Sequence, residues 1–143
     1  MPRLTPWASY RQTAIQTATP GQLVLQLYDG AITFLERALR GFEVEDPKVS
    51  METIHNNITR ARAIVEELNL SLDMCRGGEF SENMRRLYNY CDTLLEEANM
   101  AKKPDGIRDV LRRFQILRDA WNTMLSQQVV VPMDEPVALA ATG

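Results

Sequence analysis

The sequence is most constrained by residues 17–42, which have the pattern of one long helix with two apolar stripes. Thr19 suits the N-cap, Pro20 suits the first helical position, and Gln22, three residues after the cap, completes a capping box. Adjacent helical residues point about 100° apart, so stripes at adjacent positions face different directions. The first stripe consists of Val24, Leu27, Ala31, Phe34 and Ala38, and the second of Leu25, Tyr28, Ile32, Leu35, Leu39 and Phe42. Because a surface helix usually buries a single stripe, we expect this helix to be central in its fold or to face a partner.

Three further helices are predicted from apolar residues that recur at spacings of three and four. Asp46-Pro47 begins the second helix and Gly77-Gly78 ends it. The third helix covers about 79–101, and the fourth covers about 106–128 with Asp105 as its cap. Their main seams are Met51, Ile54, Ile58, Ala61, Val65, Leu68 and Leu72 in the second, Phe80, Met84, Leu87, Cys91, Leu94, Ala98 and Ala101 in the third, and Ile107, Val110, Phe114, Leu117, Trp121 and Met124 in the fourth.

Four such helices with short connections predict an all-α fold, an antiparallel four-helix bundle over residues 19–128. The chain of 143 residues is long enough for one domain with its own core. Residues 1–18 have no sustained period, and we interpret them as an N-terminal arm or short helix whose Trp7 and Tyr10 dock on the bundle. Residues 129–143, rich in proline and alanine, are expected to form a flexible tail.

The composition argues against several classes of partner. A net charge of −3 and an isoelectric point near 5.2 disfavour nucleic acid and anionic membranes, since both bind basic surfaces. No apolar run approaches the roughly 18 residues that span a bilayer, and the N-terminus lacks the apolar core of a secretory signal. Two cysteines, Cys75 and Cys91, are typical of thiols used as small apolar side chains in a reducing compartment. We therefore expect a cytoplasmic protein without membrane insertion.

The residues offer little for catalysis or metal binding. Glu52 and His55 have the spacing used in di-iron bundles, but such sites need a second motif of the same kind, and His55 is the sole histidine. Phosphotransfer from His55 in a four-helix signalling bundle is an alternative function, although Asn56 and Asn57 follow it in place of the lysine and small residues that hold a phosphate. Cys91 falls on a core seam, where burial keeps a thiol unreactive. We therefore expect no enzyme, no metal and no cofactor.

The chain has more apolar residues than the main seams of four helices can use. Ile64, Leu70, Tyr88 and Leu95 fall beside the seams, in addition to the doubled stripe of residues 20–42. Left open, these side chains would exceed the apolar patch that a soluble monomer usually exposes. Four interpretations follow: a groove for amphipathic helices of another chain, cover by the protein's own arm and tail, a bundle with wide seams, or a seam between two copies of the chain.

A series of short motifs, in order and at consistent spacing, covers residues 10–125. They are Tyr10, Thr17-Ala18-Thr19-Pro20, Leu23, Leu27-Tyr28-Asp29-Gly30-Ala31, Phe34-Leu35, Ala38, Ile64-Val65-Glu66-Glu67-Leu68, Ser71-Leu72-Asp73, Gly77-Gly78-Glu79, Asn83, Leu87-Tyr88, Tyr90, Ala98-Asn99 and Ala120-Trp121. This set resembles the FliS family, the flagellin-specific export chaperones. The residues 129–143 lie outside the resemblance.

The resemblance implies a cytoplasmic chaperone that binds the disordered C-terminal segment of flagellin, with short helices of the guest laid in apolar grooves. Such a chaperone prevents premature polymerisation and delivers flagellin to the flagellar export gate, whose FlhA-type component recognises the complex. In this family the N-terminal arm lies over part of the groove until flagellin displaces it. The resemblance implies neither ATP nor a metal, and it leaves room for a co-chaperone or an anti-sigma factor as an additional partner.

Nine residues are our predicted contacts with the flagellin segment. They come from the second and third helices and from the aromatic residues near the arm: Tyr10, Tyr28, Ile54, Ile58, Ala61, Ile64, Leu68, Tyr88 and Leu95. Four of the second-helix residues also lie on its main seam, so the same pattern is compatible with a place in the core.

Overall fold

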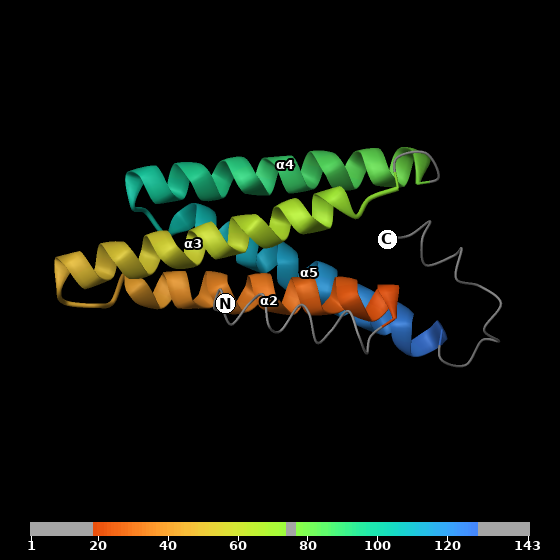
Figure 1. Cartoon of the computed structure of the whole chain (residues 1–143), viewed down its shortest axis with the longest axis horizontal. Coiled ribbons are helices and arrows are strands. Elements are labelled where there is room, and N and C mark those ends of the chain that lie inside the picture. Colours follow the sequence, from red (N-terminus) through yellow and green to blue (C-terminus); the bar gives the residue numbers. More distant parts are fainter. Residues whose placement is uncertain (1–18, 74–76, 129–143) are drawn as a thin grey trace, which may run out of the picture.

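The computed structural model describes residues 19–73 and 77–128, which form four α-helices (Figure 1). Helix α2 comprises Pro20–Gly41, α3 Pro47–Leu70, α4 Gly78–Ala101 and α5 Asp105–Gln128. Successive helices run in opposite directions, and the described residues contain no strand. The predicted antiparallel four-helix bundle is therefore confirmed. The predicted arm with Tyr10 and the predicted tail lie outside the described residues, so the division of the chain into three parts stays a prediction.

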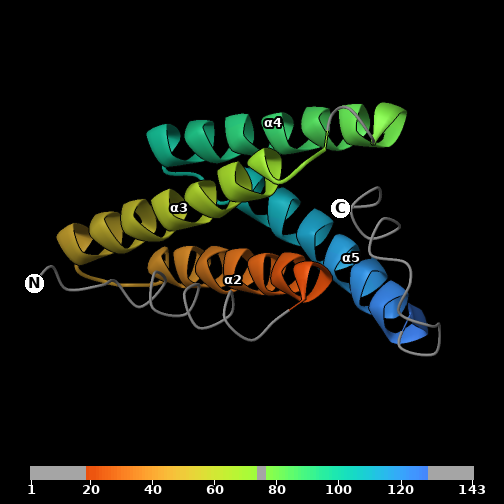
Figure 2. The same cartoon turned by 45° about the vertical axis from the view of Figure 1, so that its right-hand side comes forward.

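The four helices form a ring in which each packs against two others. Helix α2 lies beside α3 and α5, and α4 lies beside the same two, so α2 and α4 face each other across the core. Figures 1 and 2 show α5 running obliquely, so that its C-terminal half moves away from the N-terminal half of α4. The two helices approach closely at the other end, where a Cβ on Gly106 would lie 3.1 Å from the carbonyl oxygen of Leu94.

The helix starts follow the capping residues that the sequence predicts. The backbone amide of Gln22 donates to Thr19 Oγ1 at 3.2 Å, and the amide of Thr19 donates to Gln22 Oε1 at 3.1 Å, which completes the capping box of α2. The amide of Lys48 donates to Asp46 Oδ1 at 2.9 Å at the start of α3. These two caps are confirmed, whereas Asp105 is the first residue of α5 rather than its cap.

The predicted end of the second helix is wrong. Helix α3 stops at Leu70, and the glycine pair instead begins α4, with Gly77 as the N-cap and Gly78 at a φ of +52°. The amide of Gly77 and the hydroxyl of Ser81 both donate to the carbonyl oxygen of Asp73, at 2.7 and 2.9 Å. A Cβ on Gly77 would overlap the Ser81 side chain, and the left-handed backbone at Gly78 favours glycine. The pair therefore serves the turn into α4.

Both predicted stripes of helix α2 contribute buried residues, although α2 has two neighbours in the ring like every other helix. Because it packs against both α3 and α5, each flank has a helix to cover it. Toward its N-terminus, Val24, Leu25 and Leu27 are only half-buried. The buried residues of its middle belong to both stripes: Ala31, Phe34 and Ala38 from the first, and Tyr28, Ile32 and Leu35 from the second.

Helix α4 is rotated relative to the prediction. Cys91 and Ala98 of the predicted seam are buried, but so are Tyr88 and Leu95, which the sequence places beside it, whereas Phe80 at the start of the seam is exposed. Met84 and Leu87 of that seam are half-buried. On the buried face of α4, the hydroxyl of Tyr88 meets Tyr28 across the core.

The two tyrosines form the polar centre of an otherwise apolar core. Their hydroxyl oxygens lie 2.6 Å apart, and both rings meet Phe114 edge to face, with ring centroids 5.5 Å from it for Tyr28 and 6.4 Å for Tyr88. Burial raises the pKa of Tyr28 to about 12 and also raises the pKa of Tyr88. Burial likewise raises the pKa of the Cys91 thiol to about 11. All three groups therefore keep their protons near neutral pH.

Replacing Gly41 with alanine should destabilise the bundle by about 1–3 kcal/mol, the usual cost of overpacking. A Cβ at this position would lie 2.9 Å from Ile54 Cγ1 and 3.2 Å from the Ile54 backbone nitrogen, so α2 and α3 would have to separate. Urea unfolding followed by circular dichroism measures the change. Glu36→Ala, at an exposed position of the same helix, is the control and should change stability by less than about 0.5 kcal/mol. Equal stability of the Gly41→Ala and Glu36→Ala variants would contradict the close approach.

Stability should fall as the pH rises above about 10, because the unfolded chain releases tyrosine protons that the folded chain retains. Tyr28 titrates near 10.0 when unfolded and near 12 when folded, so each pH unit between these values lowers the unfolding free energy by up to about 1.4 kcal/mol. Urea unfolding at about pH 8 and about pH 11 measures this slope. The Tyr28→Phe/Tyr88→Phe variant removes both groups and should show a shallower slope. The same slope in both proteins would count against burial of the pair.

Candidate partner-binding site

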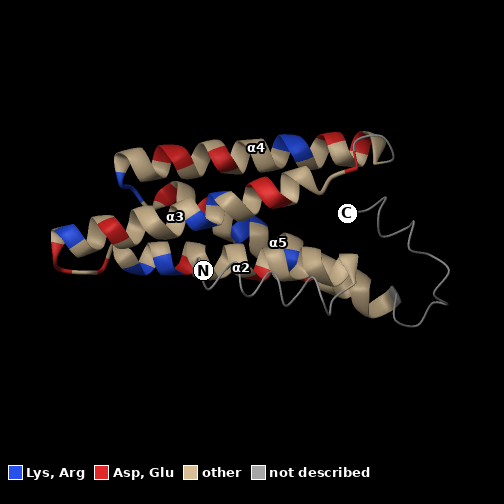
Figure 3. Ribbon diagram, viewed as in Figure 1, with Lys and Arg blue, Asp and Glu red and all other residues tan. Residues whose placement is uncertain are grey.

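An apolar groove opens between α2, α4 and α5 at the end of the bundle where α5 diverges. It encloses a cavity of about 220 Å³. Figure 3 shows that the adjoining segments, the start of α2 and the end of α5, are almost free of charged residues. The lining residues include no charged side chain: Val24, Tyr28, Leu72, Phe80, Met84, Tyr88, Leu117, Ala120, Trp121 and Met124. We call this set the apolar groove.

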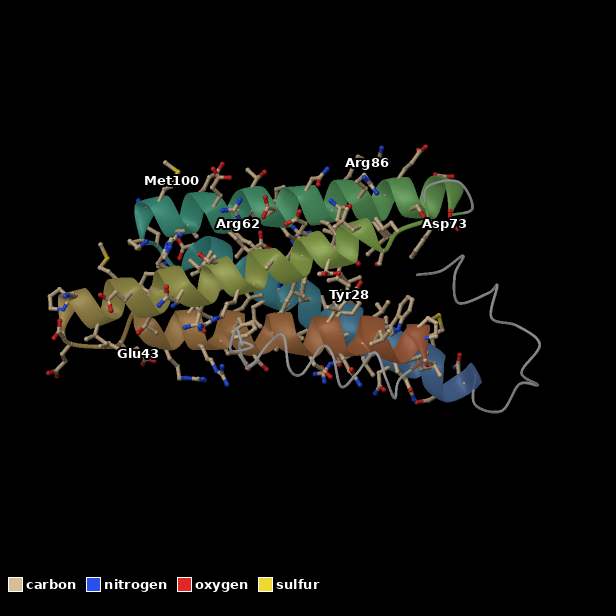
Figure 4. All side chains as sticks on the ribbon, viewed as in Figure 1. Tyr28, Glu43, Arg62, Asp73, Arg86 and Met100 are labelled. Atoms are coloured by element: carbon tan, nitrogen blue, oxygen red, sulfur yellow. The ribbon has the colours of Figure 1, made fainter. Side chains whose placement is uncertain are left out.

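Two hydrogen bonds fix the walls of the apolar groove. Trp121 Nε1 of α5 donates to the carbonyl oxygen of Gly21 at 2.7 Å, which joins the last helix to the first turn of α2. The Tyr28–Tyr88 hydroxyl contact joins α2 to α4 across the same space. Figure 4 shows Tyr28 among the side chains between these helices. The groove is therefore part of the packed bundle and is formed before any partner arrives.

On α4, the rim of the apolar groove is formed by apolar side chains that do not point into the core. Phe80 is 42% exposed although it is a large apolar side chain, and it lines the groove together with half-buried Met84. On the facing helix, Leu117 and Met124 are also half-buried. These four side chains offer apolar contact area that the bundle itself does not cover.

A second cavity, between α3 and α4, has a different chemistry. It measures about 390 Å³, and its lining includes Arg62, Glu66, Asn69, Asn89 and Asp92 together with Tyr88, which therefore borders both cavities. Arg62 Nε lies 2.8 Å from Asp92 Oδ1, and this hydrogen bond raises the pKa of Arg62. Asn69 Nδ2 donates to Asn89 Oδ1 at 2.9 Å. This cavity is larger but polar, so it suits an apolar guest less well than the apolar groove does.

The structure brings two of the nine predicted contact residues together at the apolar groove, Tyr28 and Tyr88. Tyr10 lies outside the described residues. The other six are in the core and do not line the groove, because the helices of the bundle cover them: Ile54, Ile58, Ala61, Ile64, Leu68 and Leu95. A contact between these six and a guest stays a prediction that would require the bundle to open.

The groove residues that sequence reasoning missed were assigned to core seams. Phe80, Met84, Leu117 and Trp121 all belong to the predicted seams of the third and fourth helices. The signal that could have found them is the pair Tyr88 and Leu95, because a helix with two apolar stripes can turn only one of them fully toward the core.

The two residues considered for catalysis in the sequence, His55 and Cys91, have no catalytic partner among the described residues. His55 is exposed, and its Nδ1 lies 2.9 Å from Asn99 Nδ2 of α4. Cys91 is a buried free thiol with a raised pKa, which keeps it unreactive. Within residues 19–73 and 77–128, histidine, cysteine and acidic side chains form no cluster that could hold a metal ion. None of the described helices combines the length and the hydropathy needed to cross a bilayer.

Comparison with known proteins agrees with the resemblance seen in the sequence. The family model described as flagellar protein FliS matches residues 4–128. The flagellar secretion chaperone FliS of Bacillus subtilis is 32% identical over 123 residues, which cover 86% of this chain and 88% of that protein. The FliS chaperones of Salmonella typhimurium and Campylobacter jejuni are 31% identical over 110 residues and 30% identical over 122 residues. These matches cover 77% of this chain and 79% of the Salmonella protein, and 85% of this chain and 92% of the Campylobacter protein.

The match extends over all four helices, and it favours a chaperone over the phosphotransfer alternative based on His55. A chaperone acts by contact rather than by chemistry, in agreement with a site built from apolar side chains. The chain belongs to the FliS family of flagellar secretion chaperones and is not an enzyme.

Proposed function

We propose that this chain binds the C-terminal segment of flagellin in the apolar groove and prevents that segment from polymerising before export. The observation that carries the proposal is the uncharged cavity of about 220 Å³ with exposed Phe80 at its rim. An amphipathic helix lays its apolar face into such a groove and keeps its polar face in water.

The apolar character of the groove suits a guest that is disordered before binding. A segment that folds as it binds loses conformational freedom, at a cost of a few kcal/mol or more. Broad apolar contact offsets this cost better than a few hydrogen bonds, because burying apolar surface contributes roughly 25 cal/mol per Å². The half-buried side chains of Val24, Leu117 and Met124 add to that area beside the cavity. Flagellin ends associate with one another through the same kind of apolar stripe, so covering it blocks assembly.

We further infer that the complex is delivered to the flagellar export gate in the cytoplasm, where an FlhA-type component recognises it. This step is supported by the family of flagellar secretion chaperones to which the chain belongs. The buried free thiol of Cys91 is in keeping with a reducing compartment. Tyr10 stays a proposed contact at the arm.

The direct test compares full-length flagellin with flagellin that lacks its C-terminal segment. We expect the full-length protein to bind in isothermal titration calorimetry and the truncated protein to show no measurable heat, since the guest's apolar stripe has been removed. The heat-capacity change on binding should be negative, as apolar burial requires. Equal binding of the two flagellins would rule out the proposed function.

Replacing Phe80 with alanine should weaken flagellin binding by about tenfold, because aromatic side chains at the rim of a pocket often dominate binding energy. Phe80 is 42% exposed, so the fold should tolerate the change. Met100→Ala is the matched control, since Met100 is 81% exposed and Figure 4 shows it at the far end of the same helix, pointing away from the bundle. Equal losses of affinity in the two variants would place the guest outside the apolar groove.

A further inference from the structure

We propose that the Tyr28–Tyr88 hydroxyl pair selects guest helices that carry one neutral oxygen acceptor, from a Ser, Thr, Asn or Gln side chain, within their apolar stripe. The inference rests on the proposed function, because it assigns a specificity to the same groove. The pair lines the cavity of the apolar groove and is its main polar feature.

The number of hydroxyl protons shows why the pair can donate a hydrogen bond to a guest. Two phenols carry two O–H donors, and the 2.6 Å contact between their oxygens uses one of them. Burial raises the pKa of both hydroxyls, so both protons are present near neutral pH. Among residues 19–73 and 77–128, the hydrogen bonds found for either hydroxyl are limited to this mutual one. One donor is therefore left without an acceptor from the described part of the chain.

The buried position of this O–H donor means that its lack of an acceptor destabilises the free protein. Tyr28 and Tyr88 are only 2% and 3% exposed, and both border the cavity of the apolar groove, while Tyr88 also borders the cavity between α3 and α4. The ring of Phe114 meets both phenols edge to face and supplies no strong acceptor. A buried donor without a partner loses free energy relative to one that is hydrogen-bonded. A guest that brings an acceptor into the groove removes this loss and gains affinity.

The lining of the groove decides what kind of acceptor fits. A carboxylate would be buried without a cation, because no lining residue is charged, and an unpaired buried charge is strongly unfavourable. A purely aliphatic stripe would leave the spare hydroxyl unsatisfied. A site that hydrogen-bonds its ligand discriminates more sharply than an apolar pocket does, because the analogue without the acceptor leaves the site's polar group unpaired. A neutral side-chain oxygen meets both requirements.

The test is a double-mutant cycle between the pair and flagellin. Tyr28→Phe/Tyr88→Phe removes both hydroxyls and keeps both rings, and we expect it to bind flagellin about tenfold more weakly than the native chain. Each Ser, Thr, Asn and Gln of the flagellin C-terminal segment is then replaced by alanine in turn. One of these replacements should weaken binding to the native chain about tenfold and leave binding to the double variant unchanged. Circular dichroism confirms that the variant is folded. If it does not fold, the alanine replacements in flagellin are measured against the native chain alone, and the selection is overturned if none of them weakens binding.

Tyr90→Phe is the matched control, because Tyr90 is an exposed tyrosine of the same helix with its ring against Arg113 and lies outside the groove lining. It should bind flagellin as the native chain does. The selection is overturned if Tyr28→Phe/Tyr88→Phe matches the native affinity, or if it loses the same factor against every flagellin variant. Failure of the native chain to bind flagellin at all would instead overturn the proposed function, so the two outcomes are distinct.

Discussion

The contact between Tyr28 and Tyr88 joins the two helices that face each other across the core. Helices α2 and α4 lie opposite each other in the ring, and only long side chains can meet across the core between them. The two phenols do so around Phe114, and Tyr88 and Leu95 lie in the core. The second apolar stripe of α4, which begins at Phe80, is consequently left facing the space beside α5. The orientation of α4 thus places Tyr88 and Leu95 in the core and Phe80 at the apolar groove.

The two sides of α4 differ in chemistry, and under the proposed function this difference favours the side toward α5 for an apolar guest. Toward α3, the seam carries Arg62 with Asp92 and Glu96, and the amide pair of Asn69 and Asn89. The Arg62–Asp92 ion pair is about one-third exposed, so it adds little to stability, by about 1 kcal/mol or less. Its effect is on selectivity, since an apolar helix laid on this seam would cover charges without neutralising them. Toward α5, no lining residue of the groove carries a charge.

Much of the fold could be predicted from the sequence because the relevant signals are local. Thr19 with Gln22 and Asp46 with Pro47 mark helix starts through hydrogen bonds to residues two or three positions away. The rotation of α4 could not be predicted, since the local pattern favours the longer series of apolar residues, whereas Tyr88 packs against Tyr28 and Phe114 of other helices. The same limit applies to Ile64 and Leu68 of α3, which are buried in the bundle, so their predicted contact with a guest stays a prediction. Gly77-Gly78 was placed at the wrong helix because a glycine pair suits both a helix end and the turn into the next helix.

Trp121 has a consequence for experiment that follows from its place in the wall of the apolar groove. Its indole nitrogen is held by the carbonyl oxygen of Gly21, and its ring borders the cavity. The emission of tryptophan responds to the polarity around the ring, and the chain has two tryptophans in all. Once Trp7 is replaced by phenylalanine, the protein carries a single tryptophan, located where an occupant of the groove would displace solvent.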